Sequence, residues 1–304
     1  AMRISNVDAT LAKDQATKAL NDNQGVLEGA RETIAVMGKN YINPLCAVAG
    51  WGEVYMNASM ESIVNGYEDP RGKKWYNTAL LEGYQKQLLG IPIGLPMKDG
   101  DANIYSFCSS LNTSTIGEKT GAVLMSAAEV WLLRAEAALR GYTKENPRTC
   151  YEYGVSTSFT QWDCAGASEY LESDKTPADY KDVVSGGKVG KDMKALITIS
   201  PKWEEDADIE TKLEKIITQK WLAMFPEGCE AWAEQRRTGY PRLFPVRFNH
   251  SKDGCIDTET MIRRLNFPGG LKTENAEQYA ALVEALGGDD NAGTRLWWDT
   301  GINW

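Results

Sequence analysis

The apolar positions of the chain repeat at helical spacing most clearly in residues 122–142, where they recur three and four positions apart. This spacing places them on one face of a helix, which we expect to be buried. Gly141 is a suitable C-terminal stop. A further helical segment is predicted within 147–173, so that a helical hairpin occupies about 122–173. The residues of the predicted buried face are Leu124, Ala127, Ala128, Trp131, Ala135, Ala138 and Leu139.

A second helical hairpin is predicted over about 206–240. Apolar residues stay in helical register across 206–225, and the Pro-Glu-Gly sequence at 226–228 interrupts them. A short helix then runs to Arg237 and ends at Gly239. We expect Trp221, Phe225 and Trp232 to face each other across this hairpin. Because large aromatic residues at helical spacing are more often core than ligand platform, the stretch is interpreted as scaffold.

Two weaker helical patterns lie near the ends of the chain. Residues 5–38 contain well-spaced apolar positions, but Gly25, Gly29 and Gly38 interrupt them, so two shorter helices are expected. Residues 273–286 form a single helical pattern near the C-terminus. These patterns predict an all-α fold.

Between the helices, residues 40–121 form a loop-rich section with abundant Gly, Pro, Asn, Tyr and Trp. Loops of this length in a compact domain usually have a function. The aromatic residues here follow no helical or strand period and stand among Asn, Gln, Asp and Lys. Aromatic rings can stack on the apolar faces of sugars, while neighbouring polar groups bind hydroxyls.

We therefore predict ligand-binding residues within this section and assign no catalytic residue. The expected stacking surfaces are Trp51, Trp75, Tyr76 and Tyr105, and the expected polar partners are Asn57 and Arg71.

Composition narrows the possible functions. With 42 acidic and 33 basic residues the net charge is −9, which argues against nucleic-acid binding. No apolar run reaches the ~18–20 residues needed to cross a bilayer. The opening residues show no basic-then-apolar pattern, so no signal peptide is expected in this sequence. A single histidine, His250, argues against multi-histidine metal sites and leaves little scope for a Ser–His–Asp triad.

The cysteines offer no metal or redox motif. None of the six belongs to a C-x-x-C pair. Cys150 and Cys164 could form a local bridge in an oxidising compartment, and buried free thiols are the other interpretation.

A calcium loop is only weakly indicated. Asp99, Asp101 and Asn103 begin such a pattern, but Ile104 stands where the turn glycine belongs and Ser110 where the bidentate glutamate belongs. The acidic turn 287–293 is an equally weak candidate. We expect no cofactor and no metal site, with a structural calcium ion as a minor alternative.

Carboxylates leave an enzymatic alternative open. A glycoside hydrolase needs two acidic side chains at the right separation. Candidates in the loop-rich section are Glu53, Glu61 and Asp69, although solvated or salt-bridged acids are the more ordinary interpretation for each.

Several strings identify a family resemblance. The sequences MSAAEVWLLRAEAALRGY, EDPRGKKWY and KLEKIITQKWLAMFPEGCEAWAEQRRTGYPRL resemble the SusD/RagB family, in particular its SusD-like branch. The resemblance runs in order over essentially the whole chain. It implies one SusD-like domain over 1–304, with tetratricopeptide-like helical hairpins and long loops. It also implies that the domain is N-terminally incomplete here.

The resemblance further implies a function. Such proteins are non-catalytic nutrient-binding lipoproteins of the bacterial outer membrane. They capture an oligosaccharide, sometimes a peptide, at the cell surface and pass it to a partner TonB-dependent transporter. The lipid anchor is not part of this sequence. A glycoside hydrolase on a helical scaffold and a peptide- or protein-binding adaptor remain the alternatives.

Overall fold

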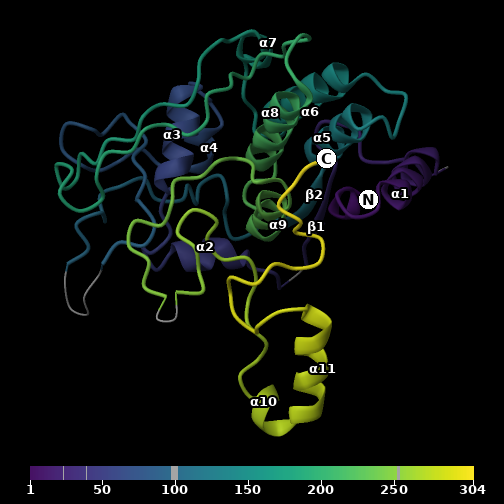
Figure 1. Cartoon of the computed structure of the whole chain (residues 1–304). Coiled ribbons are helices and arrows are strands. Elements are labelled where there is room, and N and C mark those ends of the chain that lie inside the picture. Colours follow the sequence, from purple (N-terminus) through teal and green to yellow (C-terminus); the bar gives the residue numbers. More distant parts are fainter. Residues whose placement is uncertain (23, 39, 97–101, 252–253) are drawn as a thin grey trace.

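A bundle of stacked helices forms the centre of the molecule (Figure 1). The computed structural model describes residues 1–22, 24–38, 40–96, 102–251 and 254–304. Helix α5 contacts both α6 and α8, and α8 in turn contacts α6 and α9. The mostly helical fold class is therefore confirmed, with α5–α6 and α8–α9 as helical hairpins. The bundle helices are α5 (Ala127–Leu139), α6 (Pro147–Gln161), α8 (Ile209–Ala223) and α9 (Gly228–Thr238).

Local sequence signals set the ends of these helices. Ser126, Asn146, Asp208 and Glu227 precede α5, α6, α8 and α9, and each side chain accepts a backbone N–H from the first turn. These caps satisfy donors that a helix start leaves without partners. Gly239 ends α9 in the left-handed conformation, with φ of 76°, which glycine adopts without steric cost.

Small residues bring α5 and α6 close together. Ala128 and Ala135 of α5 are fully buried, as is Leu132 on the same helix. Gly154 of α6 packs directly on Leu132, because a Cβ atom at this glycine would lie 2.6 Å from the leucine Cγ. The alanines of the predicted buried face thus allow close packing of the two helices, and α6 contributes a glycine at the same contact.

A two-stranded antiparallel ribbon corrects part of the sequence-based prediction. Strand β1 (Thr33–Val36) pairs with β2 (Ala122–Ser126), with a register shift between Ile34 and Ala35. The expected second helix of 5–38 and the expected first turn of 122–142 are both strands. Their β-branched residues suit a strand, and the pairing joins segments almost ninety positions apart, which local periodicity cannot report. Leu124, predicted to be buried, lies on β2 and is exposed.

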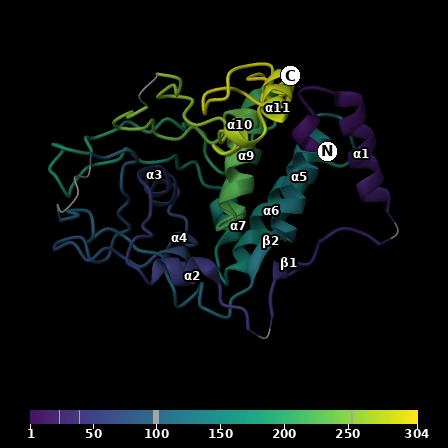
Figure 2. The same ribbon diagram turned by 90° about the horizontal axis from the view of Figure 1, so that it is seen from below.

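The remaining N-terminal elements flank the bundle. Figure 2 shows α2, α3 and α4 on one side of it and α1 on the other. The loop-rich section around α2–α4 is pinned by isolated bridges between Tyr55 and Ser110 and between Tyr76 and Leu111. These elements are η1 (Met2–Ile4), α1 (Ala9–Asn21), α2 (Pro44–Ala49), α3 (Ala58–Gly66) and α4 (Gly72–Trp75).

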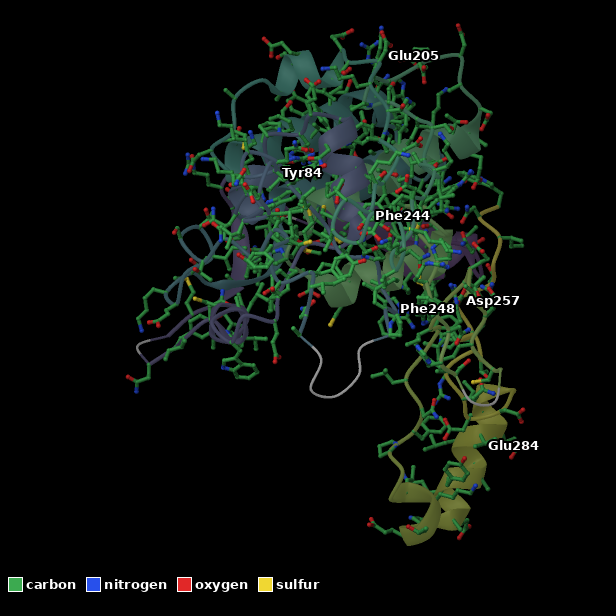
Figure 3. All side chains as sticks on the ribbon, turned by 90° about the vertical axis from the view of Figure 1, so that its left-hand side faces the viewer. Tyr84, Glu205, Phe244, Phe248, Asp257 and Glu284 are labelled. Atoms are coloured by element: carbon green, nitrogen blue, oxygen red, sulfur yellow. The ribbon has the colours of Figure 1, made fainter. Side chains whose placement is uncertain are left out.

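A C-terminal arm projects from the body (Figures 1 and 3). It carries α10 (Leu271–Glu274) and α11 (Ala276–Leu286), which together replace the single helix predicted over 273–286. Figure 3 places Glu284 on the arm, with Phe248 and Asp257 near the point where it joins the body. Asp290 braces the base of the arm by accepting hydrogen bonds from Arg264 at 2.6 Å and from the Phe267 N–H at 2.9 Å. Helix α7 (Ala167–Leu171) follows α6 in the body.

The core contains charged as well as apolar groups. Arg237 of α9 is 1% exposed, and its two terminal nitrogens lie 2.7 Å from the oxygens of Glu136 on α5. One of them also lies 2.6 Å from Glu234. This buried network ties α9 to α5 across the bundle.

Two further expectations concern cysteines and membrane spans. Cys150 and Cys164 are free thiols in the structure, so the local bridge considered from the sequence is not formed. Within the described residues, no helix combines the length and apolar character needed to cross a bilayer.

Candidate functional site

A pocket with aromatic walls lies where α8 turns into α9. We call it the aromatic pocket; its volume is about 470 Å³. Helix α3, the turn after α8, helix α9 and the segments around residues 243–246 and 261–262 all contribute to its wall. The residues that matter most below are Asn57, Tyr76, Trp221, Phe225, Trp232 and Gln235.

Both tryptophans of the α8–α9 hairpin are fixed by contacts with the rest of the protein. The indole N–H of Trp232 donates to the Ile262 carbonyl at 3.1 Å, and the Arg236 guanidinium carbon lies 3.6 Å from the ring centroid. One edge and one face of this ring are therefore engaged by the protein. Trp221 is partly buried against the main core and lines the same pocket. The scaffold interpretation of this stretch is thus incomplete, because the half-buried aromatics also present surface to the pocket.

Phe225 and Tyr76 connect the pocket with the core. Phe225 stacks on Trp75 with ring centroids 4.9 Å apart and packs against Tyr76 at 5.5 Å. Tyr76 is 7% exposed, and burial raises the pKa of its phenol, so the hydroxyl stays protonated. This part of the wall is closely packed against the core and largely apolar.

Few polar side chains reach the pocket. Asn57 caps α3, and its Oδ1 accepts from the Met60 N–H at 2.8 Å, which leaves its amide nitrogen to donate elsewhere. The Gln235 side-chain amide has no hydrogen-bond partner among the described residues. Glu227 accepts from the N–H groups of Cys229 and Glu230 at 2.9 and 3.1 Å. It is the one carboxylate on the described wall, which includes no lysine or arginine.

Three of the predicted ligand-binding residues, Trp75, Tyr105 and Arg71, have at most 1% of their surface exposed, which contradicts the roles assigned to them. Trp75 is 0% exposed and packs between Phe225 and Trp162, so it has no free face for a sugar. Tyr105 is 1% exposed, and its hydroxyl donates to the Asp182 carboxylate at 3.2 Å. These rings lack helical periodicity because they fill the core from loops.

Arg71 is the third corrected residue. It is 0% exposed, and its guanidinium pairs with Asp69 at 2.6 Å and donates to Ser158 at 2.8 Å and Gln219 at 3.1 Å. Phe159 lies beneath it, with its ring centroid 4.7 Å from the guanidinium carbon. Every nitrogen of this side chain is occupied inside the protein, so it is unavailable as a polar partner for a ligand.

The other three predicted residues have different surroundings. Trp51 is 70% exposed and directly precedes Gly52 and Glu53, which line a smaller hollow of about 310 Å³. That hollow shares Asn57 and Ile93 with the aromatic pocket. Tyr76 and Asn57 lie on the pocket wall, Tyr76 as a largely buried ring and Asn57 as a capping residue. For Trp51, Tyr76 and Asn57 the ligand role stays a prediction.

Trp221, Trp232 and Gln235 line the pocket, but they were not predicted from the sequence to do so. The signal available was the Pro-Glu-Gly interruption, because a tight turn between two aromatic-rich helices exposes the ends of both.

The three carboxylates considered for hydrolysis have different surroundings. Asp69 is neutralised by Arg71 inside the core. Glu61 is 8% exposed and accepts from the Gly90 N–H at 2.5 Å, and burial raises the pKa of its carboxyl to about 8. Glu53 is exposed on the rim of the smaller hollow.

Metal binding finds no support in the described part of the chain, where no group of three or more His, Cys, Asp or Glu side chains is placed to hold an ion. Of the candidate calcium loop, Asp99 and Asp101 lie outside the described residues, and Asn103 accepts a hydrogen bond from the Tyr105 N–H. In the turn 287–293, Asp290 is paired with Arg264.

Comparison with known proteins gives the fold its context. Residues 1–299 match the family described as Susd and RagB outer membrane lipoprotein. No curated protein sequence matches the chain. A SusD homologue from Bacteroides vulgatus is 55% identical with a TM-score of 0.96, over 100% of this chain and 61% of its own.

Two further solved structures are similar over nearly the whole chain. A chitin-binding SusD homologue from Flavobacterium johnsoniae is 37% identical, with a TM-score of 0.92, over 99% of this chain and 61% of its own. A SusD homologue from Bacteroides thetaiotaomicron is 32% identical, with a TM-score of 0.87, over 98% of this chain and 62% of its own. The chain thus spans about three fifths of the length of these relatives. The family match and these identities show that the chain belongs to the SusD/RagB family of outer-membrane lipoproteins.

Proposed function

We propose that this chain is the glycan-binding part of a non-catalytic nutrient-binding protein at the outer-membrane surface. It captures an oligosaccharide and passes it to a partner TonB-dependent transporter. The chitin-binding relative, which aligns over 99% of the chain, supports a glycan as the ligand.

The observation that carries this proposal is the aromatic pocket. Trp221 and Trp232 offer apolar ring surface, while Asn57 and Gln235 offer amide groups at its wall. This combination suits sugars, whose C–H faces stack on aromatic rings and whose polar groups need donors and acceptors. The exposed Trp51 extends the proposed site outward along the smaller hollow.

The acidic groups favour binding over hydrolysis. A glycoside hydrolase places two carboxyl groups on either side of the scissile bond. The described wall of the aromatic pocket holds one, Glu227, whose Oε1 caps α9. Of the other candidate carboxylates, Asp69 is buried in the core as an ion pair with Arg71.

Calorimetric titration of the chain with a panel of soluble polysaccharides, together with analysis of products, tests the proposal. We expect saturable binding of at least one glycan with no shortened product. Trp232→Ala should weaken that binding at least tenfold, whereas Trp297→Ala, which removes a ring that is 67% exposed and does not line the pocket, should not change it. A melting curve of each variant separates loss of the ring from loss of the fold.

Other outcomes would redirect the assignment. Shortened product from the pure chain would support a hydrolase, and binding of peptides in place of sugars would support the adaptor function. Binding that survives Trp232→Ala unchanged would place the glycan elsewhere on the molecule.

A further inference from the structure

The apolar character of the aromatic pocket exceeds what a plain hexose requires. Met60, Val246 and Leu243 join the aromatic rings on its wall. Ile93 and Ile262 also line the pocket and stay 41% and 43% exposed. Such exposed aliphatic side chains beside aromatic ones are typical of a surface that buries an apolar group of a ligand.

The polar side chains are too few to satisfy a ring that carries only hydroxyls. A buried hydroxyl left without a hydrogen-bond partner is unfavourable, because it has given up its hydrogen bonds to water. Oε1 of Glu227 already accepts two backbone N–H groups and Oδ1 of Asn57 accepts one, which leaves Oε2 of Glu227 as the carboxylate oxygen available to a ligand hydroxyl. The pocket therefore discriminates against ligands that bring many hydroxyls into it.

Gln235 is the polar group best placed to choose among ligands. Its side-chain amide lines the pocket and has no hydrogen-bond partner among the described residues, so both its donor and its acceptor are available. One amide complements another, because each offers an N–H and a C=O. The Asn57 amide nitrogen provides a second donor from α3.

Charge excludes a further class of sugar. The wall carries the Glu227 carboxylate and, within the described residues, no basic side chain. The whole chain is also acidic, with a net charge of −9. A uronic or sialic acid would bring a carboxylate towards this group without a cation to pair with it.

From this chemistry we propose that the aromatic pocket selects a glycan whose sugars carry acetamido groups. The acetamido methyl group is buried against the apolar wall, and its N–H and C=O pair with the Gln235 amide. The inference rests on the proposed function and names the class of glycan that this pocket takes.

Three oligosaccharide series with the same β-1,4-linked backbone isolate the substituent. They are fully acetylated chito-oligosaccharides, cello-oligosaccharides with a hydroxyl in place of the acetamido group, and deacetylated chitosan oligosaccharides with an amine. We expect the full chain to bind the acetylated tetramer at least tenfold more tightly than either of the others in calorimetric titration.

Gln235→Leu tests the role of the amide. The substitution preserves approximate shape and removes no hydrogen bond given by the structure, so the melting temperature should stay the same. The preference for the acetylated tetramer over the hydroxyl series should fall to less than threefold. Gln15→Leu makes the same change on the exposed surface of α1, at the other side of the bundle, and should leave the preference intact (Figure 1).

The results separate this inference from the proposed function. Equal or tighter binding of the cello-oligosaccharide, of the chitosan oligosaccharide or of an oligogalacturonate would overturn the acetamido assignment while leaving glycan binding in place. An unchanged preference in Gln235→Leu would also overturn it, since the selecting group would lie elsewhere. Failure of every oligosaccharide and polysaccharide to bind would remove both.

Discussion

Asp69 and Arg71 form an ion pair inside the core, with Oδ2 of the carboxylate 2.6 Å from Nη2 of the guanidinium. Neither side chain has any exposed surface. The pair joins the start of α4 to α6 and α8, because Arg71 also donates to Ser158 and Gln219. A sequence that suggested a ligand-binding arginine thus contains a structural one.

Removal of one member of this pair should be costly. Arg71→Met leaves the Asp69 carboxylate buried without its cation, and such changes cost ~3–5 kcal/mol. Urea denaturation of the variant should show this loss. The double variant Arg71→Met with Asp69→Asn should recover part of the lost stability. The asparagine carries no charge but still offers an acceptor to the backbone N–H of residue 71. Equal stability of the single variant and the wild type would show that the pair contributes nothing.

Trp75 should also behave as a core residue. Its ring is fully buried and stacked on Phe225, so Trp75→Ala should lower the free energy of unfolding by ~3–5 kcal/mol. Trp297→Ala is the matched control, and this exposed ring should change stability by less than ~0.5 kcal/mol. Indistinguishable denaturation midpoints for the two variants would contradict the burial of Trp75.

The sequence predicts the helical hairpins but not the burial of Arg71 and Trp75. The hairpins of α5–α6 and α8–α9 were predictable because period, caps and stop signals agree over long segments, as at Asp208 and Gly239. The loop-rich section gave no such signal. Its aromatic residues enter the core from irregular backbone held by isolated bridges, such as that between Tyr76 and Leu111, and no local period reports such burial.

The candidate site was predictable only in part, for a related reason. Trp221 and Trp232 are at helical spacing and half-buried, so one part of each ring belongs to the scaffold and another to the pocket. A periodicity argument assigns each residue to a single environment. The pocket also draws on segments around 57, 93 and 262, whose meeting depends on the tertiary fold.

Trp51 is the predicted stacking residue that the fold leaves on the surface. Trp51→Ala should change the free energy of unfolding by less than ~0.5 kcal/mol, because the ring is 70% exposed. Its proposed position beyond the smaller hollow implies a weaker, outer contact with a long glycan. Stacking of this kind contributes ~0.5–1.5 kcal/mol, so the affinity for a hexasaccharide should fall about twofold to thirteenfold. Affinity equal to that of the wild type would remove Trp51 from the site.

Glu61 should make stability depend on pH. Burial raises the pKa of its carboxyl from 4.5 to about 8, so the folded protein holds a proton that the unfolded chain releases above pH ~4.5. Stability from this group is therefore fully present below pH ~4.5 and is lost as pH rises towards 8. The loss is at most ~1.4 kcal/mol per pH unit.

The comparison with Glu61→Gln isolates this effect. Glutamine stays neutral and can still accept from the Gly90 N–H. Between pH 5 and pH 8 the wild type should lose free energy of unfolding relative to this variant, as measured by urea denaturation at several pH values. Parallel curves would show that Glu61 titrates normally.

Gly90 links the stability of the fold to the shape of the pocket. A Cβ atom at this position would lie 2.4 Å from the Asn57 carbonyl oxygen, closer than such atoms can approach. Gly90→Ala must therefore push the 90–91 segment away from the start of α3, where the Ala58 N–H donates to the Ile91 carbonyl. Overpacking of this kind costs ~1–3 kcal/mol. Because Asn57 and Ile93 line the aromatic pocket, glycan affinity should fall as well.

The matched control for this change is Gly269→Ala, where an added Cβ meets no atom within 4 Å. Gly269 lies in the segment that leads to α10, and its substitution should leave both the denaturation midpoint and the affinity as they are. Calorimetric titration and urea denaturation of both variants separate the two consequences of the Gly90 contact. A stable Gly90→Ala with normal affinity would mean that the segment can shift without moving Asn57. Reduced affinity in a protein that is still fully folded would instead show that the spacing of α3 and the 90–91 segment sets the pocket.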